Sequence, residues 1–279
     1  MTDTGAVAPG ILYIVSTPIG NLGDLSPRAV DVLRSVSSIL AEDTRHSRTL
    51  AERFDIRTPM QAYHEHNEAA VTPRLVERLR AGESFALVSD AGTPLLSDPG
   101  ARLVRAAVEA GVRVSPVPGA SALLAALVGA GLPADRFTFY GFLPRKGGER
   151  TRTLASIVAL PHTAVLYEAA NRTAETLRAL AEAGAAERET VVARELTKQF
   201  EEFRRGTAAE LAQYHEETPP RGEVVILVAG AVVEAPDEDA LRVLAAELRA
   251  EGMSARDVMR VLMETAHAPR NVAYRLAHE

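Results

Sequence analysis

The sequence predicts an α/β fold with two α/β domains and a small helical subdomain at the C-terminal end. Short apolar, β-branched runs alternate with amphipathic stretches of helical period, which is typical of a largely parallel sheet covered by helices. Farther along, the strands are separated by longer and more polar connections, and from Pro236 onward only helical patterns remain. A chain of 279 residues has the length of about two domains.

The individual elements follow from periodicity and from helix start signals. Predicted strands span 11–16, 37–40, 85–89, 112–117, 137–140, 163–168, 190–194 and 223–229, and the first helices span 28–36 and 101–110. Ser26-Pro27 and Asp98-Pro99 each place a capping side chain before a proline at the first helical position. Ser254 and Pro269 mark two later helix starts.

Changes of pattern place two domain boundaries. We expect residues 1–118 to form an N-terminal α/β domain with a mostly parallel sheet, and residues 119–235 to form a second α/β domain with a mixed sheet. Residues 236–279 are expected to form a helical tail that resembles a helix-turn-helix.

Composition excludes several classes of protein. The chain has no cysteine, so disulfides, thiolate nucleophiles and cysteine-based metal sites are excluded. Its net charge of −6 disfavours a general nucleic-acid-binding protein but leaves room for a nucleic-acid enzyme with local basic patches. The N-terminal MTDTGAVAPG lacks the features of a signal peptide, and no apolar run approaches the ~18 residues of a membrane span. We therefore expect a cytoplasmic protein that does not contact a membrane.

Three glycine-containing loops follow predicted strands of the first sheet. They are STPIGNLGDLSPR (16–28), SDAGTPLLSDPG (89–100) and PVPGASA (116–122). The carboxyl ends of parallel strands lie at one edge, where open α/β sheets bind ligands, and glycine lets the backbone approach a ligand closely. One such loop is usually a simple turn, whereas three at one edge favour a small-molecule crevice. Within the second loop, 90–95 is expected to face the ligand and 97–100 to start the next helix.

Ionisable residues follow the predicted strand 37–40. Glu42, Asp43, Arg45 and His46 lie just after its end, where acid and base side chains can position a polar substrate or move a proton. The alternative is an exposed helix start, with the acids at the positive end of the helix dipole. The sequence leaves both interpretations open.

Other polar clusters allow weaker inferences. His64 and His66 form an H-x-H pair without an evident third ligand, so a polar loop is favoured and no metal is expected. YEAANR (167–172) and ARELTKQFEEFRRG (193–206) follow strands and are either parts of a cleft wall or ordinary caps. The basic clusters at 143–152 and Arg204-Arg205 are usually solvated, but in an acidic protein they are natural places for phosphate to bind.

Seven motifs together resemble one known family. TPIGNLGD, AEDTRHS, SDAGTPLLSDPG, PVPGASA, GFLPRKGGER, YEAANR and RELTKQFEEFRRG occur in this order over about 12–228. This set is similar to the bacterial 16S rRNA cytidine 2′-O-methyltransferase family of the tetrapyrrole methylase superfamily. The resemblance implies two α/β domains with S-adenosylmethionine (SAM) in the cleft between them, usually in a homodimer. It also implies that the acceptor is the ribose 2′-hydroxyl of a decoding-centre cytidine in the small-subunit rRNA.

The resemblance also implies residue roles. The implied SAM contacts are Pro18, Ile19, Gly92, Thr93, Pro94, Leu95, Ser121, Ala122, Tyr167, Ala193 and Gly222, of which the last three rest on broader superfamily patterns. The sulfonium is already activated, so methyl transfer requires positioning in line with the breaking bond and no metal. For the general base we select Asp43, with Glu42 and Asp90 as rivals, while Arg45 would orient a phosphate or ribose and His46 would perform either task.

Two alternative functions stay open. A methyltransferase of a tetrapyrrole precursor would share the architecture, although AEDTRHS and the helical tail resemble the rRNA family specifically. A non-enzymatic RNA-binding protein that uses the tail is disfavoured by the acidity of the chain and by an aromatic content of 5%, since single-stranded bases normally stack on aromatic side chains.

Overall fold

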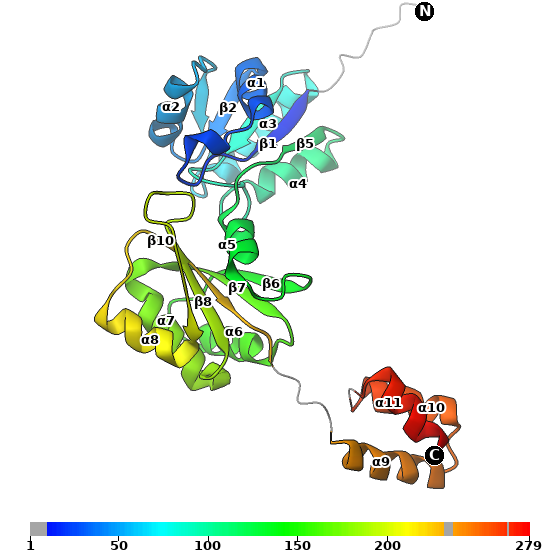
Figure 1. Ribbon diagram of the computed structural model, residues 1–279. Helices are drawn as coiled ribbons and strands as arrows, with labels where there is room; N and C mark the ends of the chain where they lie inside the picture. Colours follow the sequence, from blue (N-terminus) through cyan, green and yellow to red (C-terminus); the bar gives the residue numbers. More distant parts are fainter. Residues whose placement is uncertain (1–9, 232–236, 267) are drawn as a thin grey trace, which may run out of the picture. The chain divides into compact units, whose positions relative to one another are not determined.

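The computed structural model describes residues 10–231, 237–266 and 268–279, which belong to two compact units divided between Gly230 and Ala231. The first unit contains two five-stranded sheets, seen one above the other in Figure 1. We call the sheet β3-β2-β4-β1-β5 with helices α1–α4 the first lobe, and the sheet β6-β7-β10-β8-β9 with helices α5–α8 the second lobe. The predicted boundary between residues 118 and 119 falls inside this unit and stays a prediction.

The first lobe is a parallel sheet with helices on both faces. Its elements are β1 (Ile11–Val15), α1 (Pro27–Ser35), β2 (Ser38–Ala41), α2 (Thr44–Arg53), β3 (Met60–Ala62), α3 (Glu68–Arg80), β4 (Phe85–Val88), α4 (Ala101–Glu109) and β5 (Arg113–Val117). Every strand pair is parallel. Side chains alternate along each strand, so Leu12 of β1 packs in the core with α3 and α4, while Val15 packs in the core with α1 and α2.

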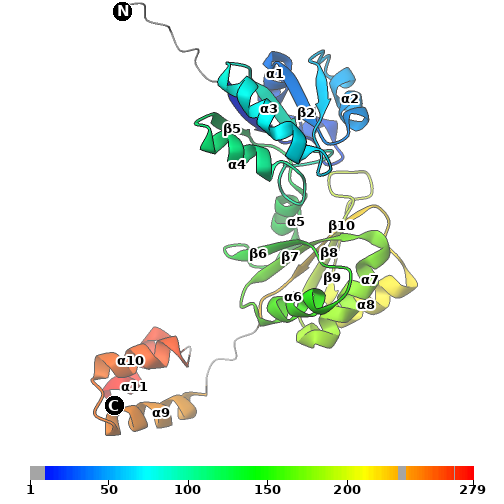
Figure 2. The same cartoon turned by 180° about the vertical axis from the view of Figure 1, so that it is seen from behind.

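The second lobe is a mixed sheet. Its elements are α5 (Ala122–Ala130), β6 (Phe137–Phe142), α6 (Gly148–Ala159), β7 (Thr163–Ala169), α7 (Thr173–Leu180), β8 (Glu189–Arg194), β9 (Glu202–Thr207), α8 (Ala208–Glu217) and β10 (Glu223–Val228). Only β6 and β7 pair in parallel. Helices α6, α7 and α8 pack on one face, as Figure 2 shows. The other face is covered by α5.

Helix α5 and two residues of the first lobe, Ile19 and the partly buried Leu96, share a core with the second sheet. The sequence of α5, ALLAALVGA, is apolar throughout, and its Leu123 and Leu127 pack with Val165, Val225 and other residues of the sheet. Ile19, from the loop after β1, packs in the same cluster and is only 7% exposed. The two lobes are therefore joined by buried apolar contacts as well as by the chain.

The predicted elements are confirmed, with two omissions. Each predicted strand is present with ends that differ by at most two residues, and Ser26 caps α1 as expected. Two strands were missed: β3 has only three residues, and β9 (EFRRGT) carries too many charges for an apolar pattern. Such edge strands are poorly marked in sequence because one side lacks a neighbouring strand.

The predicted helix start at Asp98-Pro99 is wrong. Helix α4 begins at Ala101, and its N-cap is Gly100, which has φ of 128° and no side-chain cap. A Cβ at Gly100 would lie 2.5 Å from Cδ2 of Leu87, so the close approach to β4 and the backbone conformation both require glycine here. The chain therefore turns into the helix two residues later than predicted, and the Asp98 side chain is not used as a cap.

The second unit consists of α9 (Glu238–Ala250), α10 (Ala255–Glu264) and α11 (Arg270–His278). Ser254 caps α10 as predicted, and the three helices bury a core that includes Leu241, Leu262 and Leu276. The predicted boundary at 235–236 lies outside the described residues. Within the described part of the chain, no helix combines the length and the apolar character required to cross a bilayer.

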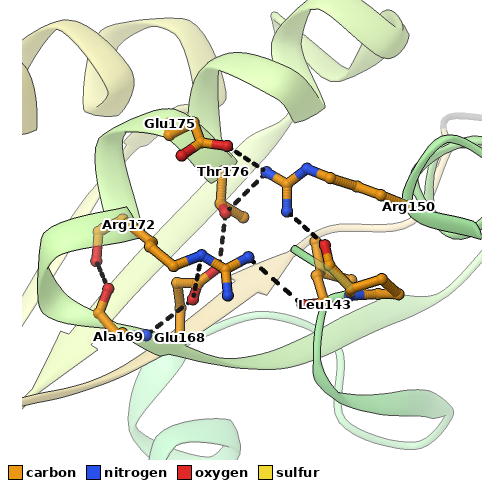
Figure 3. A network of polar contacts seen from close by, with 9 residues as sticks. Leu143, Arg150, Glu168, Ala169, Arg172, Glu175 and Thr176 are labelled. Carbon is orange, nitrogen blue, oxygen red and sulfur yellow. Dashed lines mark hydrogen bonds and ion pairs between the residues drawn. The ribbon is translucent and has the colours of Figure 1, made fainter. Parts of the chain in front are cut away.

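A buried polar network holds the loop between β6 and α6 (Figure 3). The carboxylate of Glu168, 0% exposed, accepts hydrogen bonds from the Thr176 hydroxyl (2.6 Å) and from the backbone N–H of Ala169 (2.9 Å), and lies 3.6 Å from Nε of Arg172. Arg172 donates to the carbonyl of Leu143 at 3.4 Å. One buried anion therefore orients a guanidinium that fixes the start of the loop.

The network continues through Thr176 to a second guanidinium. Arg150, itself buried, donates to the Thr176 hydroxyl at 3.3 Å and to the carbonyl of Pro144 at 3.1 Å. Thr176 thus links the two halves of the network because its oxygen accepts from Arg150 while its hydrogen is donated to Glu168.

Replacing Thr176 tests this link. We expect Thr176→Val to lower the free energy of unfolding by about 1–3 kcal/mol, because the exchange removes the hydrogen bond to the buried Glu168 carboxylate and leaves Nη2 of Arg150 only its weaker contact with Glu175. Thr176→Ser keeps the hydroxyl and loses one methyl group, which costs about 0.8 kcal/mol. Urea unfolding of the two variants measures the difference, and an equal loss in both would show that the hydroxyl does not carry the network.

Candidate active site

The three glycine-containing loops meet at the carboxyl edge of the first sheet. Thr17 and Gly92 exchange two backbone hydrogen bonds (2.8 and 3.1 Å) and so join the loops after β1 and β4. The Thr93 hydroxyl is hydrogen-bonded to that of Ser16 at 2.9 Å and donates to the carbonyl of Ala120 at 3.1 Å, which adds the loop after β5. The adjacency of β4, β1 and β5 in the sheet makes this convergence possible.

These loops form one wall of a cleft of about 530 Å³, and the second lobe forms the other. The lining residues are Ile19, Glu42, Asp90, Ala91, Gly92, Thr93, Leu96, Ser97, Asp98, Ala122, Phe142, Tyr167, Glu168, Ala169, Ala170, Gly222, Glu223, Val224 and Val225. A volume of this size lies in the usual range for small-molecule and cofactor sites.

The structure brings about half of the sequence-predicted cofactor residues into this lining. Those that line the cleft are Ile19, Gly92, Thr93, Ala122, Tyr167 and Gly222. Those outside the lining are Pro18, Pro94, Leu95, Ser121 and Ala193.

The residues outside the lining have other positions in the fold. Ser121 caps α5 through its hydroxyl, and Leu95 packs against the first-lobe core. Ala193 is fully buried in β8 beside Val225, which does line the cleft. Pro18 lines a smaller neighbouring depression. Ser121 and Ala193 thus support the cleft from behind.

Three carboxylates face the cleft from the first lobe. Burial and the charge of Asp90 raise the pKa of Glu42. Burial, followed by the charge of Glu42, raises the pKa of Asp98 to about 6. Asp90 accepts a hydrogen bond from the backbone N–H of Asp43 at 3.0 Å. The wall is therefore strongly negative, and its carboxylates favour a cation or a proton.

The predicted base Asp43 does not line the cleft. Its carboxylate caps α2 and forms two hydrogen bonds with the Arg45 guanidinium, at 3.1 and 2.7 Å. Hydrogen bonds from the side chain and backbone of Arg45 lower the pKa of Asp43 to about 2. Arg45 and His46 are exposed and also lie outside the lining, although His46 borders the depression next to Pro18. Of the four predicted catalytic residues, only Glu42 lines the cleft.

Four lining residues with evident chemistry were not singled out in the sequence: Asp98, Phe142, Glu168 and Glu223. Glu168 does lie in YEAANR, one of the segments interpreted as either part of a cleft wall or an ordinary cap. Asp98 was assigned to a helix cap. Glu168 ends the apolar run TAVLYE, and a carboxylate at the end of a buried strand is the one local signal that would have identified it. Nothing in the local pattern distinguishes Phe142 or Glu223.

Tyr167 connects the second wall to α5. Its hydroxyl accepts a hydrogen bond from the backbone N–H of Leu123 at 3.2 Å. Its ring contacts those of Phe139 and Phe142, with centroid distances of 4.8 and 5.7 Å. Burial raises the pKa of Tyr167, so its phenol stays neutral near pH 7 and serves as a fixed part of the wall.

Unusual backbone conformations concentrate around the cleft. Among the described residues, five non-glycine residues have positive φ, and four of them lie in two loops: Leu95, Ser97, Glu195 and Thr197. Each such residue costs about 1–3 kcal/mol. The second loop adjoins the lining because a Cβ at Gly222 would lie 1.9 Å from Oε1 of Glu195. Strain of this kind persists only where surrounding contacts over-determine it, and it clusters at functional sites.

The H-x-H pair is not part of a metal centre in the described part of the chain. No group of three or more histidine or acidic residues there has the arrangement of a metal site. The rings of His64 and His66 lie 5.9 Å apart in the segment between β3 and α3.

Comparison with known proteins gives the family. Residues 11–212 match the family described as Tetrapyrrole (Corrin/Porphyrin) Methylases. The chain is 50% identical over 272 residues to Ribosomal RNA small subunit methyltransferase I of Xylella fastidiosa strain Temecula1, covering 95% of this chain and 98% of that protein. It is 46% identical over 273 residues to the Synechocystis protein of the same name, covering 97% and 98%.

Solved structures show the same fold at low sequence identity. Uroporphyrin-III C-methyl transferase from Thermus thermophilus complexed with S-adenyl homocysteine is 19% identical with a TM-score of 0.57, covering 79% of this chain and 97% of that one. The methyltransferase CobJ is 18% identical with a TM-score of 0.59, covering 80% and 95%. The chain therefore belongs to the tetrapyrrole methylase family and, within it, to the group of the ribosomal RNA small subunit methyltransferase I proteins.

Proposed function

We propose that this protein is a SAM-dependent methyltransferase of 16S rRNA that acts on the ribose 2′-hydroxyl of a decoding-centre cytidine in the small ribosomal subunit. The observation that carries the proposal is the identity of about half of the residues, over nearly the whole chain, with proteins named for rRNA small-subunit methylation. The cytidine and the 2′-hydroxyl come from the resemblance of the seven motifs.

SAM as methyl donor is supported by the character of the cleft. The backbone of Gly92 reaches the lining without a side chain, and a Cβ there would lie 3.2 Å from Cγ2 of Ile19. SAM carries a sulfonium and an ammonium, and the carboxylates of Glu42, Asp90 and Asp98 in the lining suit such a cation. A structural neighbour with this fold is complexed with S-adenyl homocysteine.

For the acceptor, we propose Glu42 as the group that accepts the proton of the 2′-hydroxyl. It lines the cleft and has a raised pKa, and a base acts best when its pKa approaches the working pH. Asp43 is less suitable because Arg45 already pairs with its carboxylate. The acceptor oxygen must lie about 3–3.5 Å from the methyl carbon, in line with the breaking bond.

A homodimer and a cytoplasmic location stay predictions.

The alternative of a tetrapyrrole precursor as acceptor is favoured only by the wider family to which the chain belongs. Incubating the protein with labelled SAM and either unmodified small subunits or a porphyrinoid distinguishes the two. We expect label in one cytidine of 16S rRNA, in a form resistant to alkaline cleavage; label in the porphyrinoid alone would overturn the proposal.

Glycine 92 provides a test of the SAM site. Its φ is 81°, and Ile19 lies close to its open side, so we expect Gly92→Val to weaken SAM binding at least 100-fold by calorimetry. Gly111 has a similar φ of 72° with nothing within 4 Å of a Cβ, so Gly111→Val introduces comparable backbone strain outside the cleft. Normal SAM affinity in the Gly92 variant, or equal loss in both variants, would contradict the site.

The raised pKa of Asp98 predicts that SAM binding depends on pH. Its pKa of about 6 means that it becomes ionised, and attractive to a cation, as the pH rises through about 6. We expect SAM affinity to rise about tenfold between pH 5 and pH 7.5, the range over which ionisation increases from about a tenth to nearly complete. Asp98→Asn should flatten the profile, because the asparagine amide does not ionise over this range. The same slope in both proteins would remove Asp98 from the site.

The same shift predicts the opposite trend for stability without a ligand. When folding raises the pKa of a carboxyl group, its contribution to the free energy of unfolding is fully present below the pKa of the unfolded chain, about pH 4. This contribution is lost as the pH rises through the folded pKa, about 6. Asp98→Asn should therefore gain stability relative to wild type between pH 4 and pH 7, by about 1–2 kcal/mol after allowance for solvent screening. Thermal unfolding at the two pH values measures this change.

The two candidate bases are compared by paired substitutions. We expect Glu42→Gln to lower kcat at least about 100-fold at saturating RNA, the lower end of the usual contribution of general base catalysis. Asp43→Asn should lower kcat less than threefold. The reverse order of effects would return the role to Asp43, and SAM affinity measured in parallel separates loss of binding from loss of chemistry.

A further inference from the structure

We propose that Phe142 and the loop that follows it, residues 143–147, form the surface that binds the RNA strand around the acceptor nucleotide. Phe142 stacks on an unpaired base, and Arg145 and Lys146 bind the phosphates next to it. This inference rests on the proposed function. We call residues 143–147, with the sequence LPRKG, the basic loop.

The cationic side chains of the basic loop are available to a ligand. Arg145 and Lys146 are exposed, and no hydrogen bond or ion pair among the described residues uses either side chain. The backbone beyond them is open too: Gly147 has φ of 87° and nothing within 4 Å of a Cβ. Two adjacent cations beside open backbone suit a phosphodiester chain, which requires charge and close approach.

The other basic cluster of the second lobe is used by the fold itself. Arg204 lies 3.8 Å from the ring centroid of Tyr214 and pairs with Glu202. Arg205 donates to the carbonyls of Gly129 and Ala130. The sequence singles out two basic clusters, 143–152 and Arg204-Arg205. In the first, Arg150 is buried in the network of Glu168, but the two cations of the basic loop are left for a partner.

The basic loop is held at a fixed place beside the cleft. Arg172 and Arg150 donate to the carbonyls of Leu143 and Pro144, the first two residues of the loop. Both guanidiniums belong to the network of Glu168, which also lines the cleft (Figure 3). A loop that is ordered before binding loses less conformational entropy when a ligand arrives.

Phe142 links the basic loop to the cleft. It is the last residue of β6 and lines the cleft, yet 55% of it is exposed. None of the other large hydrophobic side chains exposed in the described residues lines this cleft. The ring of Tyr167 contacts that of Phe142 at a centroid distance of 5.7 Å.

An exposed aromatic ring next to two cations matches the chemistry of single-stranded RNA. Such strands bind by stacking bases on aromatic rings and by pairing phosphates with lysine and arginine. Enzymes that act on a base in a pocket take its nucleotide out of the helical stack. We infer the same for a ribose whose 2′-hydroxyl enters a cleft between two lobes, which leaves unpaired nucleotides beside the cleft. Phe142 and the basic loop are placed to receive them.

Charge removal tests the phosphate contacts. For the double variant Arg145→Ala, Lys146→Ala we expect the Kd for unmodified small subunits to rise at least tenfold, with SAM affinity unchanged within twofold. The slope of log K against log salt should fall by about 1.4, since each phosphate contact on a single strand contributes about 0.7. The matched control is Arg74→Ala, Arg80→Ala, two exposed arginines of α3, for which we expect less than a threefold change. Equal effects in both pairs, or no effect of the loop pair, would overturn the assignment.

Aromatic substitution tests the stacking contact. Phe142→Leu should weaken binding of the small subunit about tenfold, because it keeps an apolar side chain but loses the ring, and Phe142→Tyr should restore binding. Loss of SAM affinity without loss of RNA affinity in the leucine variant would assign Phe142 to the cofactor instead.

Methyl incorporation by the wild-type protein distinguishes failure of this inference from failure of the proposed function. If the wild-type protein methylates the small subunit and the loop variants bind it normally, the RNA surface is elsewhere. If the wild-type protein transfers no methyl group to rRNA, the proposed function itself fails.

Discussion

The pair of backbone hydrogen bonds between Thr17 and Gly92 is the constraint on which the candidate site depends. These bonds join the loops after β1 and β4, and the hydroxyl of Thr93 extends the connection to the loop after β5. Loops run over the surface, where their backbone polar groups normally bind water. In this protein, backbone groups of two loops bind each other instead. Here they hold three chain segments at one sheet edge and leave the backbone of Gly92 facing the cleft.

The same junction also determines how the lobes meet. Ile19 lies two residues after Thr17 and is buried with α5 against the second sheet. A shift in the loop after β1 would therefore disturb both the cleft wall and the apolar contact between lobes. Packing also explains how residues with positive φ are tolerated nearby. The side chains of Leu95 and Leu196 pack in the cores of the two lobes, and these contacts hold the two loops in backbone conformations that are unfavourable by themselves.

The two walls of the cleft have different electrostatic organisation. On the first wall the charge of Asp90 raises the pKa of Glu42, and the charges of Glu42 and Asp90 add to burial in raising the pKa of Asp98, so this wall gains from a bound cation. On the second wall the carboxylate of Glu168 is already satisfied by hydrogen bonds and by Arg172. The first wall is thus suited to hold a charged ligand, and the second to hold its own loops in place.

Local patterns in the sequence predict most elements of the fold and the sheet edge at which the candidate site lies. Short continuous runs of apolar, β-branched residues located the longer strands, because a strand buried on both faces needs apolar neighbours along the chain, and Ser26 and Ser254 marked helix starts through local hydrogen bonds. Which side chains face the cleft depends instead on contacts between distant parts of the chain. Asp98 lines it because Gly100 must pass close to Leu87, and Asp43 does not because Arg45 holds its carboxylate at the start of α2. Contacts between residues such as Ser16 and Thr93, 77 positions apart, leave no periodic signal in a sequence, since they depend on how the whole sheet brings its loops together.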